Sequence, residues 1–186
     1  MQGDFVNDLS EIRKRARQHV EDGVLTEAYK ANKEVVLKLL NEALATEIVC
    51  TLRYKQHYYV ADAMFAETVA AEFLEHAKEE QEHADRLAER ISQLGGTPNF
   101  NPEGLLSRSA SEYKEGKDSL VDMIREDLVA ERIAIETYTA IIRYLGDDDP
   151  TTRRLMEDLL EKEEEHADDL ASMITHLGNI TQGRGS

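Results

Sequence analysis

Apolar residues recur along four long stretches of the chain at alternating steps of three and four residues. This spacing places them on one face of an α-helix, so it predicts four amphipathic helices that face a common core. The predicted helices span residues 33–62, 64–94, 115–145 and 150–177. A shorter amphipathic segment, residues 5–29, precedes them. The pattern predicts an all-α protein built around a four-helix bundle.

Turn-forming residues separate most of these helices. The second helix is expected to end at Gly95, where a long connection begins, and the third is expected to end at Gly146. Asp149 and Pro150 are expected to be the N-cap and the first residue of the fourth helix. The signal between the first and second helices, at residues 59–64, is weaker.

Two short connections and one long connection predict two antiparallel hairpins joined by a crossover. We therefore expect an N-terminal helical extension over residues 1–31, the bundle over residues 32–177 and a flexible tail over residues 178–186.

Carboxylates and imidazoles interrupt the apolar stripe of every predicted helix. A buried carboxylate without a partner loses several kcal/mol of hydration, so such positions require an explanation. The residues are Glu47 in the first helix, Glu80 and His83 in the second, Glu131 in the third, and Glu163 and His166 in the fourth.

The heights of these glutamates along the bundle match. Two residues of an antiparallel hairpin lie side by side when the turn falls at their midpoint. The midpoint of Glu47 and Glu80 falls at the first predicted turn, and that of Glu131 and Glu163 falls at the second. Each hairpin therefore contains the same arrangement, a glutamate on the first helix and a Glu-x-x-His pair on the returning helix.

The Glu-x-x-His pairs lie within two similar stretches, KEEQEHAD and EKEEEHAD. Only the glutamates one and three residues before the histidine occur in both, and adjacent residues point about 100° apart on a helix. The choice therefore falls on Glu80 and Glu163.

Four carboxylates and two imidazoles at one level would repel one another without cations. Oxygen donors combined with neutral imidazole suit two iron or manganese ions, which a shared carboxylate can hold ~3.5–4 Å apart. We assign Glu47 and His83 to one metal, Glu131 and His166 to the other, and Glu80 and Glu163 as bridges.

Composition agrees with a metal-binding role. The formal net charge of −16 attracts cations and disfavours nucleic acid. The basic run from Arg13 to His19 is interpreted as one face of a surface helix, and Cys50, the only cysteine, excludes an internal disulfide or a CxxC site. The sequence has no apolar leader and no membrane-spanning stretch, so we expect a cytoplasmic protein.

Four stretches carry a family resemblance: LLNEALATEIVCTLRY, EEQEHADRLAERI, DLVAERIAIE and EKEEEHADDL. Residues 32–177 resemble the ferritin-like superfamily, most closely bacterioferritin. The resemblance implies a ferroxidase that oxidises two ferrous ions with oxygen or hydrogen peroxide and deposits ferric mineral in an oligomeric cage for iron storage. It also places Tyr54, seven residues after Glu47, beside the ligands. There it is either an electron donor or a buried tyrosine with one hydrogen bond.

Some features depart from the bacterioferritin pattern. Gln81 stands where haem-binding members have methionine, so haem is not expected. The N-terminal segment, together with the lack of a fifth helix after Leu177, is more similar to Dps-like proteins with a bacterioferritin-type site. The resemblance therefore favours a dodecamer over a 24-subunit cage.

Several neighbouring residues have open roles. His76 and His57 are each interpreted as an auxiliary ligand or as a core histidine bonded to a carboxylate. Glu75 and Glu79 lie off the stripe and are either an iron route or solvated surface. Asp127, one turn before Glu131, is a residue that could orient a ligand. Two other functions compete with iron storage, namely a DNA-protective, peroxide-consuming protein and a di-iron peroxidase or oxygenase that stores nothing.

Overall fold

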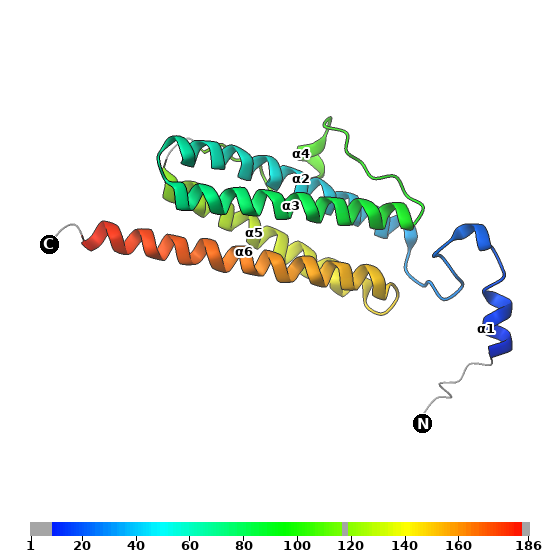
Figure 1. The fold of residues 1–186 in the computed structure, drawn as a ribbon. Helices are drawn as coiled ribbons and strands as arrows, with labels where there is room; N and C mark the ends of the chain where they lie inside the picture. Colours follow the sequence, from blue (N-terminus) through cyan, green and yellow to red (C-terminus); the bar gives the residue numbers. More distant parts are fainter. Residues whose placement is uncertain (1–8, 117–118, 184–186) are drawn as a thin grey trace, which may run out of the picture.

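Four long helices run side by side and form a bundle (Figure 1). The computed structural model describes residues 9–116 and 119–183. The bundle helices are α2 (Lys33–Ala63), α3 (Glu67–Gln93), α5 (Leu120–Leu145) and α6 (Pro150–Gly183). The predicted all-α, four-helix architecture is confirmed.

The bundle consists of two helical hairpins. α2 packs along α3, α5 packs along α6, and the hairpins meet through α2 with α5 and α3 with α6. The connection between α3 and α5 contains one short helix, α4 (Leu105–Arg108), which packs against α2 (Figure 1). This is the predicted topology of two hairpins and a crossover.

Side-chain caps fix where the helices begin. Asn32 accepts hydrogen bonds from the backbone N–H groups at the start of α2. Asp149 accepts one from Thr152 N at 2.9 Å, so the predicted N-cap of the fourth helix is confirmed. Ser119 caps α5, which begins at residue 120 rather than at the predicted 115. The prediction was wrong here because Gly116 is instead held against α2, where its N–H donates to Gln56.

The first hairpin turn comprises residues 64–66, so α3 begins at Glu67 rather than at the predicted residue 64. Phe65 has a φ of 59°, in the left-handed region that rarely accepts a bulky side chain. The midpoint of Glu47 and Glu80 nevertheless falls where α2 ends and this turn begins.

The N-terminal segment predicted for residues 5–29 is helical only in part. Its described part contains α1 (Leu9–Arg15), which has no buried residue, and a 3-10 helix (Val20–Asp22). His19 and Gly23 have positive φ angles and interrupt the helix. Residues 5–8 lie outside the described residues.

The last helix is longer than predicted. α6 continues to Gly183, whereas the sequence pattern predicted its end at residue 177 and a flexible tail beyond it. The remainder of that predicted tail, residues 184–186, lies outside the described residues.

The core has two apolar clusters separated by a polar layer. One cluster contains Leu40, Leu87, Tyr138 and Met156, and the other contains Tyr54, Phe73, Ile124 and Leu170. In each bundle helix the interrupting glutamate or Glu-x-x-His pair lies between the two clusters in sequence. Within the described ranges, none of the helices has the length and apolar character needed to cross a membrane.

Candidate metal centre

The polar layer contains all six residues that the sequence predicted as metal ligands. Each is at most 4% exposed, and the four bundle helices contribute them at one level. They form two overlapping groups in which possible ligand atoms lie within 4.8 Å of one another. The groups are Glu47, Glu80, His83 and Glu163, and Glu80, Glu131, Glu163 and His166.

The first group surrounds one imidazole nitrogen. His83 Nδ1 lies 3.0 Å from Glu163 Oε1, 3.3 Å from Glu80 Oε2 and 3.6 Å from Glu47 Oε2. Three carboxylates from three different helices therefore converge on one nitrogen atom.

The second group repeats this arrangement around the other imidazole. His166 Nδ1 lies 3.6 Å from Glu80 Oε1, 3.8 Å from Glu163 Oε2 and 3.9 Å from Glu131 Oε1. Glu80 and Glu163 belong to both groups and present a different oxygen to each histidine. This is the placement required of two bridging carboxylates, with Glu47 and Glu131 as terminal ones.

Several atoms of the layer are buried without a hydrogen-bond partner among the described residues. They are Nδ1 of His83 and of His166, both carboxylate oxygens of Glu80, Glu131 Oε2 and Glu163 Oε1. Unsatisfied charged groups are costly in a protein interior, and lone pairs that face one another suit a shared cation. The donor set of carboxylate oxygens and imidazole nitrogens fits a pair of divalent metal ions such as iron or manganese.

Burial and mutual repulsion change the acidities of the glutamates. Burial, followed by the charge of Glu80, raises the pKa of Glu47 and Glu163 well above the ordinary range. The same two causes raise the pKa of Glu131 to about 7. Burial alone would also raise the pKa of Glu80, but Glu47 and the two imidazoles lower it well below the usual value. Without metals, Glu80 therefore ionises most readily, and the other three hold their protons to higher pH than an ordinary carboxyl group does.

The histidines show the complementary effect. Burial opposes their protonation, but the adjacent Glu47 and Glu80 raise the pKa of His83 to about 10, and Glu80 with Glu131 raises the pKa of His166 to about 9. Metal ions must displace these protons in order to reach the nitrogen lone pairs, so metal affinity increases with pH.

Glu79 fixes the orientation of one imidazole. Its Oε2 lies 2.7 Å from His166 Nε2, which donates its hydrogen to the carboxylate. Nδ1 therefore faces the polar layer, and its lone pair becomes available to a metal once the Nδ1 proton is displaced. Glu79, considered from the sequence as part of an iron route, therefore contacts a predicted ligand directly, whereas Glu75 is exposed on α3.

Two tyrosines connect the hairpins in a crossed pattern. The Tyr54 hydroxyl donates to Glu131, and the Tyr138 hydroxyl donates to Glu47. Each tyrosine thus supports the terminal glutamate of the opposite hairpin. Tyr54 was predicted beside the ligands and Tyr138 was not, although Tyr138 follows Glu131 at the same seven-residue spacing.

Comparison with known proteins agrees with this arrangement. A family model described as a ferritin-like domain matches residues 37–180. The chain belongs to the ferritin-like family. It is 31% identical over 150 residues to a bacterioferritin of Desulfovibrio desulfuricans, covering 80% of this chain and 79% of the relative. A bacterioferritin of Brucella melitensis is 29% identical over 152 residues, with 80% and 88% covered. The family resemblance noted in the sequence is confirmed, and it is of the bacterioferritin type.

Solved structures of this family have the same fold. A bacterioferritin-related protein from Bacteroides fragilis, described as a dodecameric thioferritin, aligns with a TM-score of 0.79 and 28% identity, covering 84% of this chain and 94% of that one. The D. desulfuricans bacterioferritin, described with a diiron site in different catalytic states, aligns with a TM-score of 0.71 and 29% identity, covering 79% and 82%.

Asp127 and His57 form a separate network in this ferritin-like chain. Asp127 Oδ1 lies 2.9 Å from Arg53 Nε, and Asp127 Oδ2 lies 2.8 Å from His57 Nδ1. The other nitrogen of His57 lies 3.0 Å from the Lys114 carbonyl in the crossover. His57 is thus a core histidine bonded to a carboxylate, one of its two predicted roles. Asp127 therefore joins α5 to Arg53 and His57 of α2, and these two side chains bond to carbonyls of the crossover; no contact of the Asp127 carboxylate with Glu131 is found among the described residues.

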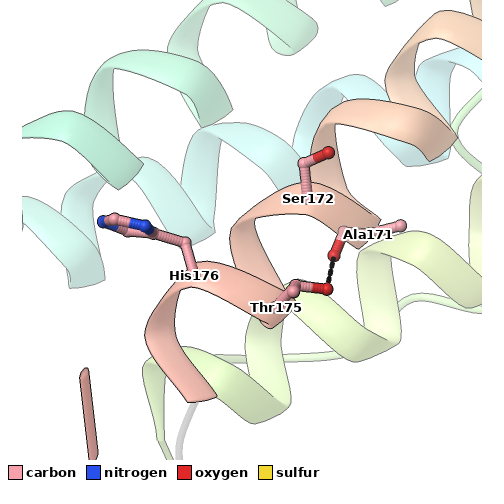
Figure 2. Close-up of a pocket in the computed structure, with 4 residues that line it drawn as sticks. All are labelled: Ala171, Ser172, Thr175 and His176. Carbon is pink, nitrogen blue, oxygen red and sulfur yellow. Dashed lines mark hydrogen bonds between the residues drawn. The ribbon is translucent and has the colours of Figure 1, made fainter. Parts of the chain in front are cut away.

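A surface hollow on α6 lies apart from the polar layer. Figure 2 shows its lining of Ala171, Ser172, Thr175 and His176, with the Thr175 hydroxyl donating to the Ala171 carbonyl. None of the six predicted ligands lines it. His176 follows His166 by ten residues, or about 15 Å along a helix, so the hollow is not part of the candidate metal centre.

Proposed function

We propose that this chain is an iron-storage ferroxidase that binds two ferrous ions between its four helices and oxidises them with oxygen or hydrogen peroxide. The observation that carries the proposal is the pair Glu80 and Glu163, each of which presents one oxygen to His83 and one to His166. Two adjacent metals, rather than one, account for that shared geometry. Membership of the bacterioferritin type supports iron as the metal.

The charges of the site suit two divalent cations. Four ionised carboxylates carry four negative charges, which two ferrous ions neutralise, and the two imidazoles bind as neutral ligands. Bound iron would supply the electrons for reduction of the oxidant. The chain holds the ions in place, excludes water from the buried layer and releases the protons of its glutamates and histidines as the ions enter.

The hydroxyls of Tyr54 and Tyr138 act on the terminal ligands. Tyr138 donates to Glu47 Oε1 and leaves Oε2, which faces His83, for the metal. Tyr54 donates to Glu131 Oε1 and leaves Oε2 without a hydrogen-bond partner among the described residues. Each hydroxyl therefore fixes one oxygen of a terminal carboxylate. Both rings are fully buried, and each belongs to one of the two apolar clusters that flank the site. This keeps the ligands in position before iron arrives.

Storage requires a closed assembly, and we propose a homododecamer. The similarity to a dodecameric protein of B. fragilis supports twelve subunits. Haem is not part of the proposal, because Gln81 stands where haem-binding members have methionine and an amide lacks the thioether sulfur.

The test is oxidation of ferrous iron added stepwise to metal-free protein. We expect about two irons per chain to be oxidised in a fast phase, followed by a larger amount that stays soluble and elutes with the oligomer. The variant Glu163→Gln should lose the fast phase, whereas Glu82→Gln, an exposed residue of α3, should retain it.

Two results would change the proposal. An unchanged fast phase in Glu163→Gln would show that oxidation occurs elsewhere. A fast phase of two irons followed by precipitation would retain the oxidase and exclude storage.

A further inference from the structure

A second cluster of possible ligands lies beside the metal centre. Ligand atoms of Glu72, His76 and Asp169 lie within 4.8 Å of one another. Glu72 and His76 occupy successive turns of α3, and Asp169 follows His166 by three residues on the adjacent α6 (Figure 1). Asp169 is exposed and Glu72 is partly exposed, so the cluster opens to solvent at its outer side.

His76 extends this cluster into the protein interior. Its side chain is 2% exposed, and its Nδ1 is buried without a hydrogen-bond partner among the described residues. Its Nε2 lies 3.5 Å from Glu72 Oε1. The ring stacks on His166 at a centroid distance of 4.0 Å, and His76 also groups with Glu131 and His166 within 4.8 Å. His76 therefore lies between the outer carboxylates and His166, a predicted ligand of the metal centre.

The internal repeat shows that packing does not require these polar residues. Counting from the Glu-x-x-His histidine of each hairpin, the position of His76 corresponds to Leu159 and that of Glu72 to Leu155. Leu159 is fully buried in the apolar core, and Leu155 packs against it. The same bundle position therefore holds a leucine in one hairpin and an imidazole with an unsatisfied nitrogen in the other. Burying that polar group costs stability that a leucine would not cost.

The electrostatics of the cluster suit a cation. Burial and the charge of Asp169 raise the pKa of Glu72. His76 adds an imidazole whose Nδ1 has no hydrogen-bond partner among the described residues. Two carboxylates and a neutral imidazole form a donor set for Fe²⁺, Mn²⁺ or Zn²⁺.

We propose that Glu72, His76 and Asp169 bind a third divalent cation near the surface. From this site the cation transfers past His76 to the two-metal centre. Binding at this site is independent of oxidation chemistry, but its role in loading rests on the proposed ferroxidase function. The two hairpins then differ in function, because only the hairpin with His76 provides a route from solvent to the ligands.

Equilibrium dialysis of the metal-free oligomer against Zn²⁺ tests the proposal. Excess Mg²⁺ is included because it occupies sites made only of oxygen donors and leaves those with imidazole. Three Zn²⁺ per chain are expected, two at the centre and one at the new site. The double variant Glu72→Gln/Asp169→Asn should bind two. The control Glu82→Gln/Asp168→Asn removes the same charges from exposed positions of the same helices and should bind three.

A count of two in all three proteins would overturn the third site while leaving the centre intact. A count of three in the double variant would also overturn it. Fewer than two would instead contradict the two-metal centre itself, so the two failures can be distinguished.

The variant His76→Leu introduces the residue found in the other hairpin and should fold. We expect it to lower affinity for the third Zn²⁺ by about tenfold or more and to slow filling of the centre. Unchanged affinity would contradict a role for His76 as a ligand.

Discussion

The metal-free protein should lose stability as pH rises from 5 to 7.5. The pKa of Glu131 is about 7 in the folded state against an ordinary value of 4.5. The folded state therefore binds more protons between these values, and this stabilisation, complete below pH 4.5, is lost as pH rises through 7. One pKa unit equals about 1.4 kcal/mol, so Glu131 alone accounts for about 3 kcal/mol.

The other groups fix the shape of the profile. Glu47 and Glu163 also have raised pKa values and act in the same direction. His83 has its pKa raised to about 10, so its contribution is present below its unfolded pKa of about 6.5 and is lost towards pH 10. Glu80 has a lowered pKa, so its contribution is lost only as pH falls below the usual carboxylate range. His166 acts like His83, because its pKa is raised to about 9. His76 acts in the opposite direction: its pKa is lowered to about 3, so its contribution is lost as pH falls from 6.5 towards 3. The three glutamates with raised pKa values outweigh His76 above pH 5, so we expect maximum stability near pH 5.

Urea denaturation with a chelator present measures this profile. Protein concentration must be held constant, because the stability of an oligomer depends on it. The variant Glu131→Gln should give a flatter profile and be more stable than the parent at pH 7.5, although its metal site is impaired. Added Zn²⁺ should remove the decline in the parent. A flat or rising profile in the metal-free parent would refute clustering of the buried carboxylates.

Three further predictions concern the surroundings of the centre. Glu79→Ala removes the acceptor of an imidazole N–H and should lower Zn²⁺ affinity by about 10–100-fold in calorimetric titration. Tyr138→Phe removes the hydrogen bond to Glu47 and should slow ferrous oxidation in stopped-flow measurements while leaving two metals bound; an unchanged rate would exclude a supporting role. Asp149→Ala leaves Arg90 buried without its carboxylate partner and should cost about 3–5 kcal/mol in urea denaturation. A loss below 1 kcal/mol would contradict that pairing.

Much of the fold and the grouping of the six polar residues could be predicted from the sequence. Helical periodicity predicted which residues face the core. The position of each turn midway between two glutamates predicted which glutamates lie at the same height in the bundle. Both depend on regular helix geometry, which is local and uniform. The same reasoning placed the turn near Met64 even though Phe65, which adopts a left-handed conformation there, gives no glycine signal.

Other features depend on contacts that no local pattern contains. α5 begins late because Ser119 caps it and Gly116 bonds to α2, both decided by the path of the crossover. The hydrogen bond from His166 to Glu79 joins residues on different helices. Tyr138 could have been found, because its spacing from the third-helix glutamate repeats that of Tyr54 in the first.

Diffraction from crystals soaked with Mn²⁺, recorded with anomalous scattering, tests the central claim most directly. Two peaks about 3.5–4 Å apart are predicted within the polar layer. One should lie at Nδ1 of His83 and the other at Nδ1 of His166, with Glu80 and Glu163 contacting both. A single peak in the layer, or peaks that share no carboxylate, would contradict the two-metal centre.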